Sequence, residues 1–212
     1  MRNQFAPYAQ CTIFFVAFAA CDAQSATPTD STAATASSVV ETSADVESLE
    51  AQSPFCTEPG WSTFDFWLGD WNLRVGTPGA DANAPWVYAH GTDRIQKKYG
   101  GCVIEERFDS PDFPGGRWAG TSVSQWVPSS NQWQQTWVDN QSAYLLHYGG
   151  PDDHGQMILY SAPVTKNGAV HQHRMVFWDI QKNSIHWRWE GTKDGGQTWT
   201  SEITIDYTRR GR

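Results

Sequence analysis

A carboxylate in an otherwise apolar strand pattern is the first feature with chemical potential in this 212-residue sequence. In the stretch CVIEERF, Glu106 shares a face with Ile104 and Phe108, because side chains two apart in a strand point the same way. A carboxylate that faces an apolar interior is costly unless it is paired or protonated, and burial raises its pKa. Glu106 is therefore our candidate catalytic residue, as a general acid or base, or alternatively a ligand anchor. A structural carboxylate paired with an arginine is the other interpretation.

Tryptophans with the same spacing form a second candidate group. The stretch WQQTWVD places Trp133, Gln135 and Trp137 on one face, and Trp187 and Trp189 share a face further along the chain. Indole rings with an amide between them suit a flat or sugar-like ligand. These residues are predicted to bind the ligand together with Glu106, although packing of the barrel interior would give the same pattern.

A histidine pair is the third candidate. In HQHRMVF, His171 and His173 share a face with Met175 and Phe177, so we add His173 to the predicted ligand-binding residues. Such a pair can bind a metal or haem iron, but the sequence places no carboxylate or cysteine beside it. We therefore predict neither a metal site nor a cofactor, with haem as the minor alternative. Nucleophile-elbow, Walker and dinucleotide-binding glycine motifs are absent from the sequence.

The elements that would position these residues are short strands. Polar and apolar residues alternate in runs that end at Gly, Pro, Asn or Asp, which is the pattern of strands and turns. We expect an all-β domain, a single antiparallel up-and-down β-barrel of about ten strands, because closure removes exposed sheet edges and leaves room for one small ligand. The expected strands are 71–75, 86–96, 102–108, 117–127, 132–139, 144–148, 156–162, 169–179, 184–190 and 199–208.

The stretch FDFWLGDWNL opens this domain with both helical and strand periodicity. Ser62 and Asp65 have the spacing of a capping box, which predicts a short helical turn. After Gly69 the period changes to two, with Trp71 on the inner face. The sequence thus predicts a helical turn that closes one end of the barrel, followed by the first strand.

A short turn, then Gly69-x-Trp71, then an arginine after the last strand (Arg209 or Arg210) resembles the calycin pattern. The calycins include lipocalins, fatty-acid-binding proteins and ten-stranded nitrobindin-like barrels, and the resemblance implies that the tryptophan and the arginine stack to close one end. The motifs FDFWLGDW, GGCVIEE, WQQTWVD and WEGTKDGGQTW, over about 64–208, are similar to the bacterial family called domain of unknown function 1579. That family implies a barrel and no activity. Nitrobindin-like barrels carry their haem-ligating histidine near the chain end, whereas nothing after His186 is a histidine here.

Residues 192–199 also match the Asp-box pattern S/T-x-D-x-G-x-T-W. Sialidase-like propellers carry several copies of this pattern, but one copy cannot build propeller blades. We expect a structural hairpin in which Asp194 accepts hydrogen bonds from turn amides and Trp199 packs beneath it.

The N-terminal third differs in composition from the barrel region. Residues 1–20 contain an apolar run that suits a secretory signal peptide, and FAAC at its end resembles the lipobox of bacterial lipoproteins, which predicts lipidation at Cys21. An ordinary signal peptide cut near Ala20 or Ala23 is the alternative. Residues 21–55 are rich in Ala, Ser and Thr and carry six acids without Lys or Arg, which predicts a flexible tether before the domain at 56–212.

Charge and cysteines limit the partners. The net charge is −8, and the tether holds −6 of it, so with Arg2 (+1) set apart the domain carries −8 − 1 + 6 = −3. No basic stripe for nucleic acid exists. In an oxidising compartment Cys56 and Cys102 are expected to form a disulfide, with two separate thiols as the alternative.

The sequence therefore predicts a barrel that binds a small apolar or aromatic molecule in its lumen, lipid-anchored in the bacterial cell envelope and facing the periplasm or the exterior. The alternatives are a cofactor-free enzyme that uses Glu106 as acid or base, and a filled structural barrel without a ligand. The sequence names neither the ligand nor the oligomeric state.

Overall fold

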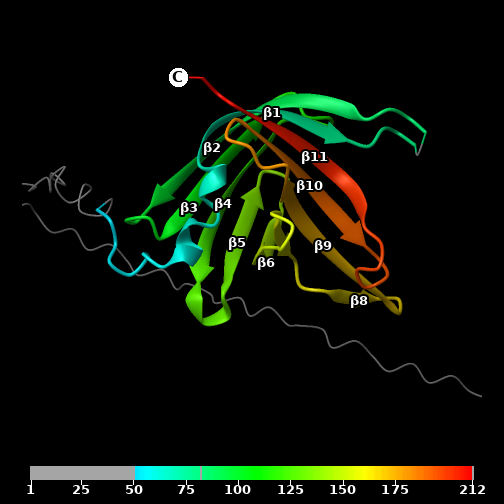
Figure 1. The fold of residues 1–212 in the computed structure, drawn as a ribbon. Coiled ribbons are helices and arrows are strands. Elements are labelled where there is room, and N and C mark those ends of the chain that lie inside the picture. The colour runs from blue at the N-terminus through cyan, green and yellow to red at the C-terminus, as the bar shows by residue number, and fades with distance from the viewer. Residues whose placement is uncertain (1–50, 82, 212) are drawn as a thin grey trace, which may run out of the picture. The chain divides into compact units, whose positions relative to one another are not determined.

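The computed structural model describes residues 51–81 and 83–211 (Figure 1). The predicted signal peptide, the lipidation site at Cys21 and the tether up to residue 50 lie outside these residues. No helix in the described part is long and apolar enough to span a membrane.

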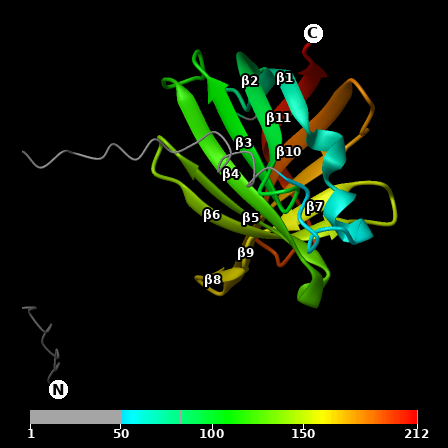
Figure 2. The same ribbon diagram turned by 90° about the vertical axis from the view of Figure 1, so that its left-hand side faces the viewer.

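Ten strands form a closed antiparallel barrel (Figures 1 and 2). Each strand pairs with the next along the chain, β7 pairs with β9, and the β11–β1 pairing closes the ring. The predicted all-β barrel is confirmed. The strands are β1 Gly69–Thr77, β2 Val87–Lys98, β3 Val103–Ser110, β4 Trp118–Val127, β5 Gln132–Asp139, β6 Tyr144–Pro151, β7 Met157–Tyr160, β9 Ala169–Trp178, β10 Ser184–Thr192 and β11 Thr200–Arg209, while β8, Val164–Lys166, pairs only with β9 outside the ring.

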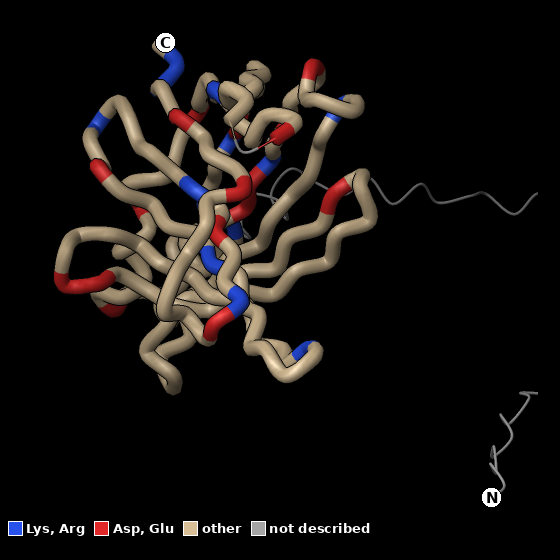
Figure 3. Tube along the Cα trace, turned by 90° about the vertical axis from the view of Figure 1, so that its right-hand side faces the viewer, with Lys and Arg blue, Asp and Glu red and all other residues tan. Residues whose placement is uncertain are grey.

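Inner and outer faces alternate as the period-two pattern predicts. In β1, Trp71, Leu73 and Val75 are buried, and the residues between them are exposed or half-buried. Because apolar side chains from all sides meet inside the ring, the core lies along the barrel axis. Positions of Lys and Arg are interspersed with positions of Asp and Glu along the described chain (Figure 3).

The predicted short helical turn at one end of the barrel is confirmed, but the predicted Ser62 cap is wrong. Two 3-10 turns, η1 Pro59–Ser62 and η2 Asp65–Trp67, form this end, and a third, η3 Pro128–Ser130, joins β4 to β5. Ser62 does not cap a helix, because its hydroxyl donates a hydrogen bond back to the Pro59 carbonyl, and Phe64 takes the N-cap position of η2. The buried rings of Phe64 and Trp67 stack 5.1 Å apart and plug this end of the barrel.

An arginine stacked on a tryptophan lies at the same end. The Arg209 guanidinium lies 4.0 Å from the Trp71 ring centroid and donates a hydrogen bond to the Leu68 carbonyl at 2.8 Å. Gly69 has φ +125°, and a Cβ there would lie 2.4 Å from the guanidinium. Only glycine therefore fits the bend between the plug and β1 while leaving Arg209 in place.

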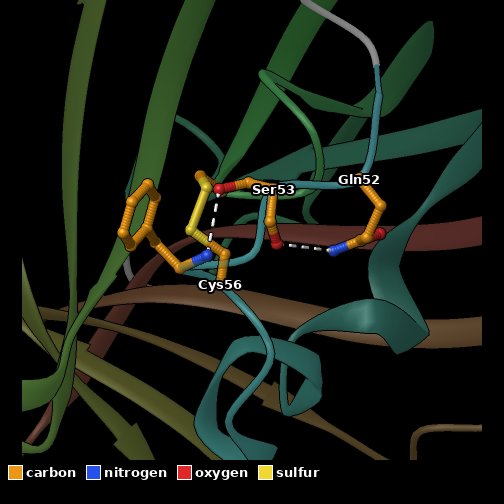
Figure 4. Close-up of a disulfide and its surroundings, with 5 residues drawn as sticks. Gln52, Ser53 and Cys56 are labelled. Atoms are coloured by element: carbon orange, nitrogen blue, oxygen red, sulfur yellow. Dashed lines mark hydrogen bonds between the residues drawn. A yellow bond between two sulfur atoms is a disulfide. The ribbon is translucent and has the colours of Figure 1, made fainter.

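The predicted disulfide between Cys56 and Cys102 is confirmed. Figure 4 shows it beside Gln52 and Ser53, and the Ser53 amide donates a hydrogen bond to the Gly100 carbonyl at 2.9 Å. The segment that enters the domain is thus fixed to the β2–β3 turn, at the plugged end. Because the strands run up and down, the β1–β2, β3–β4 and β5–β6 connections lie at the opposite end.

Candidate functional site

A cavity of about 300 Å³ occupies the lumen above the plug. Five of the seven predicted ligand-binding residues line it: Glu106, Gln135, Trp137, Trp187 and Trp189. The other lining residues are Trp67, Phe108, Phe113, Trp118, Asp139, Gln141, Ala143, Leu145, His147, Met175, Phe177, Ile203, Ile205 and Tyr207. Residues from the β3–β4 and β5–β6 connections are among them, so the cavity extends toward the end that has no plug.

One wall of the cavity is aromatic and held in place by a carboxylate. Trp118 and Trp137 lie edge to face with 5.9 Å between ring centroids, and both indole N–H groups donate to Oδ2 of Asp139 at 3.0 Å. Backbone amides of Gln141 and Ala143 donate to the other carboxylate oxygen. Burial acts to raise the pKa of Asp139, but these hydrogen bonds outweigh it and lower the pKa. Asp139 is therefore an ionised group that fixes two indole rings near the mouth.

A pair of buried carboxyl groups lies deeper, and sequence analysis identified only one of them. Glu106 on β3 is 6% exposed, and the neighbouring Asp93 on β2 is 2% exposed. Burial raises the pKa of Glu106 to about 7, against the opposing effects of Ser122 and Asp93. Burial, and then the charge of Glu106, raises the pKa of Asp93 far above its ordinary value. The Tyr207 hydroxyl donates a hydrogen bond to Asp93 at 3.5 Å.

These groups form an acid cluster whose proton content changes near neutral pH. Asp93 keeps its proton, while Glu106 loses its proton close to pH 7. A general acid or base needs a pKa of this kind, near the pH at which it works. The alternation in β2, where Ala89, Asp93 and Ile95 are buried, was the available signal for Asp93. No Lys or Arg lines the cavity among the described residues, so the arginine partner considered for Glu106 is not there.

His147 on β6 is a second lumenal residue that sequence analysis did not identify. Its side chain is 2% exposed, and neither ring nitrogen has a hydrogen-bond partner among the described residues. The ring lies edge-on to Trp189 with 5.1 Å between centroids. Burial, with a smaller contribution from the charge of His173, lowers the pKa of His147 to about 4. The imidazole is therefore neutral at physiological pH, with one donor and one acceptor unused inside the cavity.

Two predicted ligand-binding residues do not line the cavity. His173 lies in the middle of β9, stacks on Trp189 with 5.2 Å between ring centroids and is 3.6 Å from Glu202, with its side chain half-exposed. Trp133 does face inward, but it packs on Phe64 in the plug and donates its indole hydrogen to Thr63. Trp133 is thus part of the packed interior at the plugged end of the cavity, which agrees with the alternative that these tryptophans pack the barrel interior.

Gln135 faces the cavity but is already engaged, because its amide nitrogen donates to the Ser124 hydroxyl at 3.0 Å. His171 lies with His173 outside the cavity, beside the β10–β11 hairpin. Within residues 51–81 and 83–211, no group of three or more His, Cys, Asp or Glu side chains is placed to hold a metal ion.

The Asp-box segment forms the β10–β11 hairpin. Asp194 accepts hydrogen bonds from the amides of Gln197 and Thr198 and from the Thr198 hydroxyl, and the Trp199 indole donates to the Gly196 carbonyl. These hydrogen bonds, led by those from the Thr192 and Thr198 hydroxyls, lower the pKa of Asp194. The carboxylate is fully occupied by its own turn.

Comparisons with known proteins concern the fold alone. No family model matches the sequence, and a search of curated proteins finds no match. The S-type phycobiliprotein lyase CPES from Guillardia theta is a solved structure similar to this chain, with 10% sequence identity and a TM-score of 0.46 over 70% of this chain and 91% of the lyase chain. The closed barrel is shown by the strand pairings of this chain, and the resemblances of its motifs to the calycins and to domain of unknown function 1579 stay predictions.

Proposed function

We propose that this barrel binds a small apolar or aromatic molecule in its lumen. The observation that carries the proposal is the cavity of about 300 Å³, which is walled by indole and phenyl rings. Its volume lies at the small end of the range of ligand sites, roughly 300–1,000 Å³. Polar groups that a ligand could engage, Glu106 and His147 among them, reach a mostly apolar space, which is the usual composition of a small-molecule site.

Two adjacent residues of β6 offer a matched test. Leu145 lines the cavity, whereas Leu146 points outward and is 59% exposed. Leu145→Trp fills the lumen, and Leu146→Trp adds the same side chain outside it. Native mass spectrometry of the full-length protein, purified gently from an envelope extract of its host, should show an added mass that dissociates on denaturation. We expect this mass in the wild type and in Leu146→Trp and its absence in Leu145→Trp; a mass retained equally in both variants would overturn the proposal.

The proposed setting is the bacterial cell envelope, with a lipid anchor at Cys21. The FAAC pattern supports it, as does the disulfide, which is typical of exported domains. Cys21→Ala should release the protein from membranes into the soluble fraction, and intact-mass analysis should show the loss of the acyl groups. Wild-type protein without a lipid mass would contradict the anchor and leave lumenal binding untouched.

A cofactor-free enzyme is the second candidate, favoured by one observation. Glu106 touches the cavity and titrates near pH 7, where a general acid or base works best. If the lumen performs acid–base catalysis, Glu106→Gln abolishes turnover of the captured molecule but leaves its binding measurable. Unchanged turnover in that variant would exclude this role for Glu106.

A further inference from the structure

The charged groups of the cavity are all acidic. Glu106, with Asp93 behind it, lies deep in the lumen, and Asp139 lies near the mouth. No lysine or arginine lines the cavity among the described residues. His147 contributes no positive charge at neutral pH, because it is buried without a partner. A negative group therefore lies at each end of the lumen without a compensating cation.

Tryptophan is the most frequent residue type in the cavity lining. Five indoles line the cavity: Trp67, Trp118, Trp137, Trp187 and Trp189. The face of an indole ring attracts a cation through its quadrupole, more strongly than tyrosine or phenylalanine does. Asp139 strengthens this effect at two rings, because it accepts hydrogen bonds from the N–H edges of Trp118 and Trp137. Walls of this kind favour an organic cation over a neutral molecule of the same shape.

An anion would meet the opposite conditions. It would enter past ionised Asp139 and approach the carboxyl pair, and no basic side chain in the described lining would compensate its charge. His147 lines the cavity as a neutral side chain without a hydrogen-bond partner among the described residues, and it can hydrogen-bond to a polar atom of a ligand. Its ring nitrogens are an observation independent of the acids, and they also indicate that the lumen takes a molecule with polar as well as apolar parts.

We propose that the lumen selects an organic cation, a primary amine or ammonium group on a compact aromatic or apolar body, with the charged group against Glu106. This inference rests on the proposed function, since it names the ligand class of the same cavity. Ion pairing with a buried carboxylate and contact with indole faces together provide the selectivity.

Three probes of one shape test the inference. Isothermal titration calorimetry of the full-length protein at pH 8 would compare 1-naphthylmethylammonium, 1-naphthylmethanol and 1-naphthoate. We expect the ammonium to bind at least tenfold more tightly than the alcohol and the carboxylate to bind most weakly. An alcohol that binds as tightly as the ammonium would overturn the charge selectivity and leave the lumenal binding site standing. Absence of binding by all three probes would also overturn it, whereas the host-purified mass measurement decides the proposed function separately.

The pH dependence of affinity supplies a second readout. The groups that face Glu106 are Asp93 from β2, Ser122 from β4 and Tyr207 from β11. Asp93 and Tyr207 have raised pKa values and stay protonated, so only Glu106 in this cluster changes charge between pH 6 and pH 8. The ionised fraction of Glu106 rises from roughly a tenth to nine tenths over this range, so affinity for the ammonium should rise roughly tenfold. Affinity for the alcohol should stay constant. An ammonium affinity that does not change with pH would overturn the placement of its charge against Glu106.

Two variants localise the effect. Glu106→Gln should bring the ammonium and alcohol affinities together and remove the pH dependence, whereas Glu105→Gln, which alters an outward carboxylate paired with Arg107, should change neither. Asp139→Asn should weaken ammonium binding while keeping its pH dependence. Thermal denaturation of each variant confirms that it folds. If Glu106→Gln retained the full preference for the ammonium, the proposed contact would be wrong.

Discussion

The two ends of the barrel lumen differ in the kind of buried polar group that each leaves without a hydrogen-bond partner. At the plugged end, the Trp71 indole donates to the Trp67 carbonyl at 2.8 Å, and Arg209 donates to the Leu68 carbonyl. The buried indole N–H groups of Trp61 and Trp67 have no partner in the part of the chain that the structure describes, but an indole does not titrate. In the cavity, an oxygen of Asp93 and both ring nitrogens of His147 have no partner among the described residues, although both side chains are as deeply buried.

This difference separates the residues that stabilise the fold from the residues that a bound molecule can contact. Each unsatisfied buried polar group costs roughly 1–3 kcal/mol at either end, but only in the cavity are these groups titratable, so only there does the cost change with pH. We expect changes at the plugged end to alter stability and changes in the cavity to alter pH response and binding.

The largest expected effect is at Trp71. Trp71→Ala removes a fully buried ring together with its contacts to Tyr207 and Arg209, so the free energy of unfolding should fall by about 3–5 kcal/mol. Trp187→Ala, which removes a half-buried ring beside existing empty space, should cost about 1–2 kcal/mol. Urea unfolding of both variants measures the difference. Equal losses would break the distinction between the two ends.

The disulfide should come next. It joins residues 46 apart, and closing a loop of that length removes unfolded-state entropy worth roughly 4 kcal/mol in the chain-entropy model, which native-state strain or residual structure reduces. The double variant Cys56→Ser with Cys102→Ser should lose most of this stability and retain lumenal binding at low temperature. Lost binding in a variant that is still folded would show that the plugged end shapes the cavity as well.

The sequence predicted the buried face of most strands, because alternation and turn residues are local signals. Glu190 is an exception: the alternation places it on the solvated face, but a bulge after Trp189 shifts the register and Glu190 is buried.

The sequence did not predict how far along the barrel axis each inward side chain lies, because that position depends on the tilt and stagger of the paired strands. His173 and Trp133 show the consequence: one lies beside the β10–β11 hairpin and the other in the packed interior at the plugged end, although the face of each was readable. The register that pairs Ile95 with Glu106 brings Asp93 next to Glu106, and no single-strand pattern contains that information.

The sequence also contains local signals for the β8–β9 hairpin and for the 3-10 turns that the strand pattern does not include. Asn167-Gly168, with φ of 52° and 78°, is the strongest short-range hairpin signal, and it explains the β8–β9 pair that the strand pattern missed. The missing Ser62 cap has a different cause. Pro59 and the buried ring of Trp61 favour a 3-10 turn against β4, where Gly60 packs on Trp126 too closely for any side chain.

Glu106 should give an effect that grows with pH. Its pKa is about 7 in the folded state against 4.5 in the unfolded state, so the folded protein holds more protons and Glu106 lowers stability as pH rises through this window. Glu106→Gln should match the wild type near pH 4.5 and exceed its free energy of unfolding by about 3 kcal/mol above pH 7, at about 1.4 kcal/mol per pKa unit. Urea unfolding from pH 4.5 to 8 tests this, with Glu105→Gln as the control whose curve should stay parallel to the wild type. A constant gap between Glu106→Gln and the wild type would contradict the raised pKa.

His147 should show the mirror image, and at neutral pH its effect is the smallest of the four. Its pKa is about 4 in the folded state against 6.5 in the unfolded state, so the folded protein holds fewer protons, and wild-type stability from this group is lost as pH falls through the window. His147→Phe keeps the ring against Trp189 and removes the titration. Near pH 7 it should gain only the stability of removing an unsatisfied polar group, roughly 1 kcal/mol, and its advantage over the wild type should widen by about 3 kcal/mol toward pH 4. The advantage of Glu106→Gln grows in the other direction, so unfolding curves of the two variants at matched pH values should cross. Two curves that never cross would mean that the two groups do not titrate in opposite directions inside one lumen, and the contrast between the plugged end and the cavity would have to rest on packing alone.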